Sequence, residues 1–319
     1  MQEILITGTD GFIGGILKDH FEKEGFRVFG TTFFRDAGPN EVKFDIQKEE
    51  EMVKLPVKLP ERSFDAIVHT IALVDQTLPM DLVRRVNAEG TRKMVEWGKR
   101  NGVKHFIQIS SVAVYGNKVI GENIPETTPR CTKGNPYPVT KAEAERIIEQ
   151  ANIPYTMVRL PPLVGPNDTF LTPTILPRLL KGTFYFTGKK DRTFSTLYVR
   201  NLGPVISAII KKGPQNTIFN CADYLVKWKE FIAEYVRQLG ISMPSVTKSF
   251  LVGLFHLRDR MEAMTITYSY FGASYNNARL AQVIGLENMT QFKWQDGVHE
   301  AIDTYFKKHP EIKDPRNST

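Results

Sequence analysis

Residues 4–15 of the chain read Ile4-Leu5-Ile6-Thr7-Gly8-Thr9-Asp10-Gly11-Phe12-Ile13-Gly14-Gly15. Apolar residues followed by glycines three apart predict a buried parallel strand, a tight turn and the start of a helix. In such a turn Gly8 allows the sharp bend, Gly11 lets backbone amides approach a pyrophosphate, and Gly14 lets the helix pack closely on the strand. The helix N-terminus offers unpaired N–H groups to the phosphates. We therefore predict a dinucleotide-binding turn, although ordinary glycine-rich turns share this spacing.

The remainder of the first half alternates short β-rich runs with helical runs, which predicts a parallel sheet with helices on both faces. We expect strands at 27–32, 66–71, 105–110 and 155–160, helices at 80–100 and 137–150, a polar linker around 56–63 and a loop from 116 to 136. Past Pro161 several prolines interrupt the chain, and from Lys227 onward the pattern is mainly helical.

This pattern predicts a fold class and a division of the chain. The fold class is α/β, a Rossmann-like doubly wound parallel sheet with a smaller, mainly helical C-terminal substrate lobe. We assign residues 1–160, with a return near 195–220, to the dinucleotide-binding domain. The substrate lobe takes residues 161–194 and 221–319.

The composition is that of a globular protein with 319 residues, 41% of them hydrophobic, which can bury a large core. No run reaches the roughly 18 uncharged apolar residues that span a bilayer. The longest candidate runs from Phe250 to Leu257. Because the chain starts in a strand, we expect no signal peptide, no membrane association and a cytoplasmic location. The net charge of +7 comes from scattered residues, so we expect no nucleic-acid partner, and the two cysteines lack the spacing of a metal site.

The residues after the second predicted strand bear on the choice between NAD and NADP. In dinucleotide folds an acidic residue near this strand end binds the ribose 2′-hydroxyl, whereas an arginine suits a 2′-phosphate. Thr32 ends the strand and Arg35 follows it with no carboxylate at the strand end, which favours NADP. In the alternative, Arg35 is an ordinary loop charge and Asp36 supplies the acid. Asp45, after a short β run, is a candidate for the adenine amino group.

A second pattern with chemical meaning is Tyr137-Pro138-Val139-Thr140-Lys141. On a helix, Tyr137 and Lys141 point to the same face. An adjacent ammonium lowers the pKa of a tyrosine, which then shuttles a proton to or from an alcohol or ketone while hydride moves to or from a nicotinamide. Ser110 and Ser111 end a predicted strand at the carboxyl edge of the sheet, where one of them polarises the substrate oxygen. Each feature alone also arises by chance.

Taken together, the motifs occur in the order seen in the extended short-chain dehydrogenase/reductases. They are Thr7-Gly8-x-x-Gly11-Phe12-Ile13-Gly14, Val68-His69-Thr70-Ile71-Ala72, Asn87-Ala88-Glu89-Gly90-Thr91, Ser110-Ser111-Val112-Ala113-Val114-Tyr115-Gly116, Tyr137-x-x-x-Lys141 and Arg159-Leu160-Pro161-Pro162-Leu163-Val164-Gly165-Pro166. Segments 197–201 and 277–285 resemble later elements of these enzymes. The chain thus resembles the NAD-dependent epimerase/dehydratase family over most of its length.

The resemblance implies a role for each matching residue. Tyr137 resembles the catalytic acid/base, Lys141 the residue that tunes it and holds the nicotinamide ribose, and Ser111 the group that polarises the substrate oxygen. With the strand-end residues included, the expected cofactor-binding positions are Gly8, Gly11, Phe12, Ile13, Gly14, Thr32, Arg35, Asp45, Ile46, Ile71, Ala72, Tyr137, Lys141 and Pro161. Asn87 matches a position that is usually architectural in these enzymes.

Departures from the family pattern bear on the substrate. Sugar 4,6-dehydratases carry an Asp-Glu pair where this chain has Val112-Ala113, so a dehydratase is not expected. Many nucleotide-sugar epimerases place an arginine that grips the diphosphate where this chain has Phe194. Arg192 is the nearby cation that would replace it, and Arg200 or Lys189 would also contribute. The candidate substrate residues are therefore Arg192, Phe194 and Arg200.

Three hypotheses follow, in order of preference. The first is a nucleotide-sugar 4-epimerase or 4-ketoreductase that uses NAD(P), with NADP favoured. The second is an oxidoreductase similar to 3β-hydroxysteroid dehydrogenases or flavonoid reductases. Its hydrophobic pocket would be lined by Phe184, Tyr185, Phe186, Phe194 and the 250–257 segment. The third is a non-catalytic dinucleotide sensor, against which the intact Tyr-Lys pair argues. The resemblance also implies a homodimer formed by helices 80–100 and 137–150.

Overall fold

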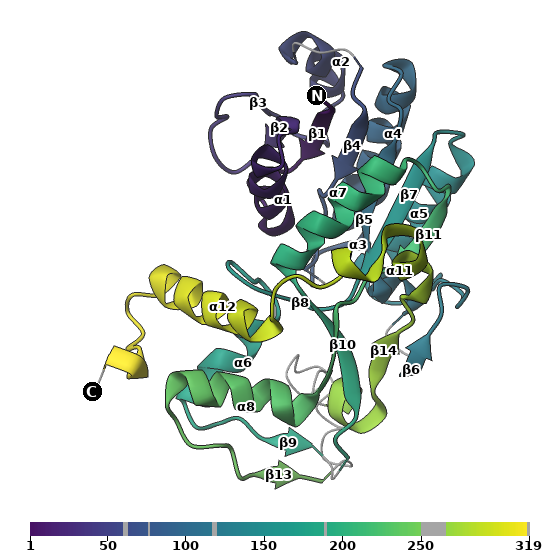
Figure 1. Cartoon of the computed structure of the whole chain (residues 1–319). Coiled ribbons are helices and arrows are strands. Elements are labelled where there is room, and N and C mark those ends of the chain that lie inside the picture. The colour runs from purple at the N-terminus through teal and green to yellow at the C-terminus, as the bar shows by residue number, and fades with distance from the viewer. Residues whose placement is uncertain (60–62, 76, 117–119, 188–189, 250–265, 318–319) are drawn as a thin grey trace.

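The computed structural model describes residues 1–319 apart from 60–62, 76, 117–119, 188–189, 250–265 and 318–319. Its N-terminal part is built on a seven-stranded parallel sheet of order β11-β7-β5-β4-β1-β2-β3 (Figure 1). The strands are β1 (Glu3–Thr7), β2 (Arg27–Thr32), β3 (Glu41–Lys43), β4 (Ala66–His69), β5 (Phe106–Ser111), β7 (Tyr155–Leu160) and β11 (Thr217–Asn220). The order reverses beside β1, so β1 and β4 flank the position where open α/β sheets bind ligands.

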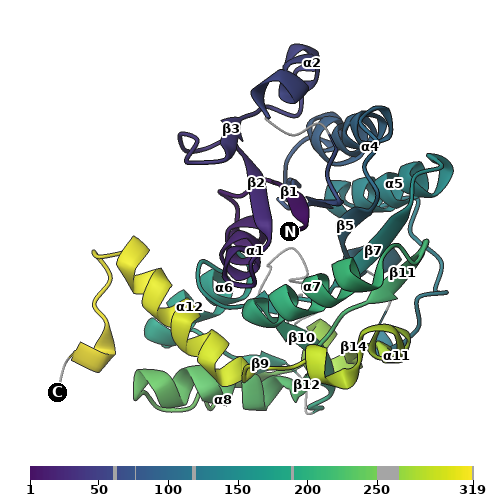
Figure 2. The same ribbon diagram turned by 45° about the horizontal axis from the view of Figure 1, so that its top comes forward.

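Helices cover both faces of this sheet. They are α1 (Phe12–Lys23), α2 (Glu49–Lys58), α3 (Met80–Arg84), the π-helical turn η1 (Arg85–Glu89), α4 (Gly90–Arg100), α5 (Pro136–Gln150), α7 (Leu202–Lys212) and α11 (Ala278–Ile284). In Figure 2, α1 and α7 lie on one side of the sheet and α4 and α5 on the other. Strand β1 shows why both faces are covered: Ile4 and Ile6 enter the core beneath α1 and α7, whereas Leu5 enters the opposite core.

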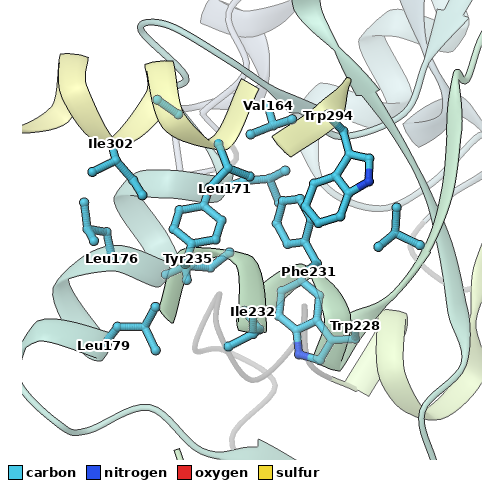
Figure 3. Packing of buried hydrophobic residues seen from close by; sticks show 14 of the residues in the cluster. Val164, Leu171, Leu176, Leu179, Trp228, Phe231, Ile232, Tyr235, Trp294 and Ile302 are labelled. Atoms are coloured by element: carbon cyan, nitrogen blue, oxygen red, sulfur yellow. The ribbon is translucent and has the colours of Figure 1, made fainter. Parts of the chain in front are cut away.

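The second part packs helices against a smaller sheet. Its strands are β6 (Gly121–Ile124), β8 (Leu163–Val164), β10 (Thr193–Tyr198), β12 (Tyr224–Lys227) and β14 (Ala273–Tyr275), with a separate pair β9 (Phe186–Thr187) and β13 (Thr247–Lys248). Its main helices are α6 (Leu171–Leu180), α8 (Trp228–Leu239) and α12 (Trp294–Lys308). Figure 3 shows side chains from these three helices converging on one apolar core, with Phe231 of α8 between Trp228 and Trp294.

The predicted doubly wound sheet and helical C-terminal part are confirmed, with differences in detail. The predicted polar linker around 56–63 begins inside α2. A short helix forms there because burial of Met52 and Leu55 on its apolar face stabilises it. The predicted loop from 116 to 136 contains β6, which pairs with β14 of the second sheet. Residues before position 160 therefore contribute to both parts of the chain. Segment 250–257, expected to line a pocket, lies outside the described residues.

Two further observations concern the described part of the chain. None of its helices combines the length and apolarity that crossing a membrane requires. Its histidines, cysteines and carboxylates form no cluster suited to a metal ion, and Cys131 and Cys221 are both free thiols.

Candidate active site

The glycine turn has the shape that a pyrophosphate cradle needs. Gly8 has φ of +77°, a left-handed conformation that suits glycine, and its amide donates to Thr31 Oγ1 at 3.0 Å. A Cβ on Gly14 would overlap the Gly8 carbonyl, and one on Gly11 would lie 3.2 Å from the same oxygen. Helix α1 begins directly after Gly11, and no side chain caps its first amides. The turn therefore leaves helix N–H groups available for phosphate oxygens.

The other residues predicted to line the turn lie beside it or anchor it. Ile71 is half-buried next to Gly8, with its Cγ1 3.1 Å from where a Gly8 Cβ would stand, and Ala72 follows it. Phe12 is partly buried against the core of the second part of the chain, and Ile13 against the core under α1. Pro161 is buried directly after Leu160, which pairs with Ser111 in the sheet.

The loop after β2 differs from the prediction, because carboxylates do reach the end of this strand. Glu41, at the start of β3, receives a two-pronged hydrogen bond from the Arg35 guanidinium, with both N···O distances 2.7 Å. Asp10, inside the glycine turn, accepts backbone hydrogen bonds from the same loop. Thr32 is buried, and its hydroxyl finds no hydrogen-bond partner among the described residues. The premise of the NADP prediction, that no acid stands here, was wrong.

The two residues predicted for the adenine pocket differ in exposure. Asp45 is half-buried and its carboxylate accepts from the Gln47 amide at 3.0 Å. Ile46 is 5% exposed and packs under Gly90, where a Cβ would stand 2.9 Å from Ile46 Cδ1. Ile46 is therefore mainly a core residue, and a contact with adenine stays a prediction for both.

Ser111, Tyr137 and Lys141 come from two elements that meet at the carboxyl end of the sheet. Ser111 is the last residue of β5, and its Oγ accepts from the Ala113 amide at 3.1 Å. Helix α5 starts at Pro136, which sits at the first helical position where its missing N–H costs no hydrogen bond. Tyr137 in its first turn lies close enough to the Ser111 side chain for this hydroxyl to act on its pKa. The two predicted catalytic hydroxyls are thus brought together.

Lys141 lies one turn further along α5 and is almost fully buried. Its Nζ donates to the backbone carbonyl of Ile109 in β5 at 2.6 Å. Burial lowers the pKa of Lys141 to about 8, with Glu145 acting in the opposite direction. Lys141 therefore sits on the same face of α5 as Tyr137, as predicted, with its ammonium held by the sheet.

The sequence predicted that the adjacent Lys141 lowers the pKa of Tyr137, but in this structure the pKa of Tyr137 is raised. Burial raises the pKa of Tyr137, and the nearby Ser111 side chain acts in the opposite direction without cancelling this increase. The physical reason is that desolvation disfavours the phenolate, while the Lys141 ammonium is bound to the Ile109 carbonyl. Ser111 is therefore the group that favours proton release from Tyr137 in this structure.

A buried ionic network beneath these residues was not predicted from the sequence. Glu145 of α5 is fully buried, and Arg159 of β7 forms two hydrogen bonds to its carboxylate, at 2.9 and 2.7 Å. Ser110 donates to the same carboxylate at 2.6 Å, and Arg130 lies 3.3 Å from it. A glutamate four residues after Lys141 and an arginine in the middle of a buried strand were the available signals, since a buried charge requires a partner. The network ties α5 to β5 and β7.

Two further residues fix the loops around the site. Asn87 bonds both backbone groups of Leu73 and donates to Thr140 Oγ1 at 3.0 Å, so it holds the 71–73 loop against α5. Tyr115, which follows Ser111 in a 3-10 turn, is buried and donates to Asn220 Oδ1 at 2.6 Å. Both contacts are architectural.

The three substrate candidates are not brought together. Phe194 is fully buried in an aromatic cluster with Trp228 and Tyr268, so it belongs to the core of the second part of the chain. Arg200 forms an ion pair with Glu300 of α12 at 2.8 Å. Arg192 is half-exposed, and its ion pair is with Glu122 at 3.3 Å. Phe184 and Phe186 are also core residues. Phe184, Phe186 and Phe194 thus pack in this core, whereas Tyr185 is partly buried and Lys189 lies outside the described residues.

The fold and this edge of the sheet define a dinucleotide-binding enzyme of the Rossmann class. Residues 4–222 match the sequence model of the NAD dependent epimerase/dehydratase family. Because this match covers more than half of the chain, the chain belongs to that family. It is accordingly an NAD(P)-dependent enzyme, as the motifs predicted.

Individual relatives are distant and differ in substrate. The chain is 25% identical over 188 residues to an N-acetyl-alpha-D-glucosaminyl-diphospho-ditrans,octacis-undecaprenol 4-epimerase from Escherichia coli O157:H7, covering 56% of each protein. It is 28% identical over 224 residues to a 3-beta-hydroxysteroid dehydrogenase from Mycolicibacterium neoaurum, covering 63% of this chain and 59% of that one. The match therefore spans little more than half the length of these relatives.

A solved structure agrees over almost the whole chain. The Bordetella bronchiseptica enzyme WbmH in complex with NAD+ superposes with a TM-score of 0.79 over 96% of this chain and 99% of that one. The sequence identity is 20%, so this similarity establishes the fold alone.

Proposed function

We propose that the protein is an NAD(P)-dependent oxidoreductase or epimerase that acts on a nucleotide-sugar, as a 4-epimerase or 4-ketoreductase. The observation that supports it best is the arrangement of Ser111, Tyr137 and Lys141, which the end of β5 and the start of α5 bring to one edge of the sheet, with the Lys141 ammonium bound to a β5 carbonyl. The relative that is a 4-epimerase of a diphosphate-linked sugar supports the substrate class.

The proposed chemistry assigns one task to each side chain. The dinucleotide, when bound, would accept or supply a hydride. Tyr137 Oη takes the proton of a sugar hydroxyl during oxidation and returns one during reduction. When substrate is bound, the single O–H of Ser111 turns from Tyr137 to the same substrate oxygen and stabilises the charge that develops there. Lys141 supplies positive charge below the phenolate, and its ammonium also suits the ribose hydroxyls of the dinucleotide.

The residues present fit that dinucleotide. The glycine turn has no room for side chains where a pyrophosphate would approach, and the first turn of α1 offers uncapped amides. Ile71 and Ala72 border the turn on the side of β4.

A matched pair of variants tests this mechanism. Tyr137→Phe removes the proton shuttle, whereas Tyr155→Phe makes the same chemical change at the N-terminal start of β7, at the opposite edge of the sheet. Turnover of UDP-, GDP- and dTDP-sugars is followed by NMR of the epimerised or reduced product. We expect Tyr137→Phe to lower the rate at least about 100-fold and Tyr155→Phe to leave it unchanged. Equal rates for all three proteins would refute the assignment.

A second candidate is an oxidoreductase acting on a hydrophobic alcohol or ketone, which the 3-beta-hydroxysteroid dehydrogenase relative favours. The positions of Phe184, Phe186 and Phe194 weaken it, because these side chains pack in the core of the second part of the chain. Thermal-shift measurements with nucleotide-sugars and with steroids, each in the presence of dinucleotide, separate the two, since a ligand of the native state raises the melting temperature.

We also propose a homodimer formed through the 80–100 segment and α5. Helices α4 and α5 lie together on one face of the sheet, which supports this choice. Light scattering of the purified protein gives the mass directly, and a monomeric mass at working concentration would rule the dimer out.

A further inference from the structure

The glycine turn carries a carboxylate that binds the loop after β2. Asp10 Oδ2 accepts hydrogen bonds from three successive backbone amides, those of Phe33 at 2.7 Å, Phe34 at 2.6 Å and Arg35 at 3.4 Å. Successive N–H groups that converge in this way form an anion-binding concavity. In this chain the concavity is filled by the protein's own carboxylate.

A second carboxylate binds the cation of the same loop. Glu41 pairs with the Arg35 guanidinium and also accepts from Thr9 Oγ1 at 2.7 Å and from the Gly38 amide at 2.8 Å. The hydrogen bond from Arg35 lowers the pKa of Glu41 to about 2, against the effect of burial, so the carboxylate stays charged. Gly30 makes the contact possible, because a Cβ there would lie 2.6 Å from Thr9 Cγ2 and 3.1 Å from Glu41 Cγ.

This cluster lies where dinucleotide folds distinguish their cofactors. The Thr9 amide donates to the Thr31 carbonyl at 2.9 Å, so the glycine turn is joined directly to the carboxyl end of β2. At that strand end a carboxylate suits the ribose 2′-hydroxyl and a free cation suits a 2′-phosphate. Here the amides and the guanidinium that would bind a phosphate are both taken by carboxylates. A 2′-phosphate would have to displace them or lie beside two fixed negative charges.

We propose that Asp10 and Glu41 act together as specificity-determining residues that make this chain select NAD(H) over NADP(H). The inference rests on the proposed dinucleotide-dependent function and reverses the preference predicted from Arg35 alone. It assigns Arg35 the task of holding Glu41 in place.

Calorimetric titration with NADH and NADPH, after removal of any copurified dinucleotide, tests the proposal without an activity assay. For the unmodified chain we expect NADH to bind at least about tenfold more tightly than NADPH. Asp10→Asn and Glu41→Gln each remove one negative charge, and each is expected to shift the ratio of the two dissociation constants toward NADPH by about tenfold or more. Glu50→Gln makes the same charge change on an exposed residue of α2 and is expected to leave the ratio unchanged.

Glu41→Asp keeps the charge and separates electrostatics from loop structure. It is expected to retain the preference for NADH that Glu41→Gln loses. Equal or tighter binding of NADPH by the unmodified chain would overturn the proposal, as would an unchanged ratio in both Asp10→Asn and Glu41→Gln. A chain that binds neither dinucleotide contradicts the proposed function itself, and the inference falls with it.

Discussion

The edge of the parallel sheet that carries Ser111, Tyr137 and Lys141, called here the catalytic edge for its proposed role, differs in organisation from the region predicted to hold the substrate. At the edge, the Glu145 carboxylate, the Arg159 guanidinium and the Lys141 ammonium are buried, and each is tied to a neighbouring element. In the substrate region, Arg192 is half-exposed and Phe194 is a core residue. The polar groups of the first region are thus held by the sheet, whereas the residues predicted to bind substrate have separate partners in the second region.

The largest expected effect comes from breaking the buried ion pair at the sheet edge, with the exposed pair of the other region as its control. Arg159→Met leaves the Glu145 carboxylate buried with one partner fewer, and we expect a loss of about 3–5 kcal/mol in the free energy of unfolding. Arg192→Met breaks an exposed pair, and its expected cost is below about 1 kcal/mol. Urea unfolding followed by circular dichroism measures both. Similar losses for the two variants would remove the distinction between the regions.

A truncation in the second region is expected to be the next largest effect. Phe194→Ala opens a cavity beside Trp228 and Tyr268, and we expect it to lower the free energy of unfolding by about 3 kcal/mol. The matched control is Phe34→Ala, because Phe34 is 81% exposed and its loss should cost less than about 0.5 kcal/mol. If Phe194 lined a substrate pocket instead, the variant would raise the KM for substrate while the unfolding curve stayed in place.

Much of the catalytic edge was predictable, because its residues follow local rules. The strand-turn-helix pattern around Gly8 and the four-residue spacing of Tyr137 and Lys141 act over short distances, and the structure places both as expected. The partner of Arg35 was not predictable in this way. Glu41 reaches the end of β2 only because β3 pairs beside it, a contact set by the tertiary fold.

The second region was harder to predict for a related reason. Strand β6 lies more than 140 residues before its partner β14, so no local pattern reveals the pairing. Arg200 was identified as a cation near a family position, but its partner Glu300 comes from α12 and could not be foreseen. Sequence spacing gives a residue its place in an element, whereas the neighbours of a charge depend on packing between distant elements.

The pH dependence of stability reports on the buried ammonium at the catalytic edge. Burial lowers the pKa of Lys141 from its ordinary value of 10.5 to about 8. Between these values the unfolded chain binds more protons than the folded chain, so this group makes the folded state relatively more stable as the pH rises. For one group we expect about 2 kcal/mol between pH 8 and pH 10.

Lys141→Met removes this titration and leaves the other groups in place. The difference in unfolding free energy between Lys141→Met and the unmodified chain is expected to favour the variant at pH 8 and to shrink by about 2 kcal/mol at pH 10. Lys99→Met, at the exposed end of α4, is the control and should show no such change. A constant difference across this range would mean that Lys141 is not desolvated.

The smallest expected effect concerns the two arginines that were predicted to bind the substrate. Arg192 and Arg200 both form ion pairs, but the Arg200 pair with Glu300 also receives a hydrogen bond from Tyr198 at 2.6 Å, so Arg200 is more firmly held. We expect Arg192→Gln to weaken binding of a nucleoside diphosphate by about tenfold or less, and Arg200→Gln to weaken it less than that. Calorimetry with UDP and GDP, in the presence of saturating dinucleotide, measures both. A larger loss in Arg200→Gln would show that its pair with Glu300 opens to receive the ligand, and that packing between α12 and β10 contributes to substrate binding.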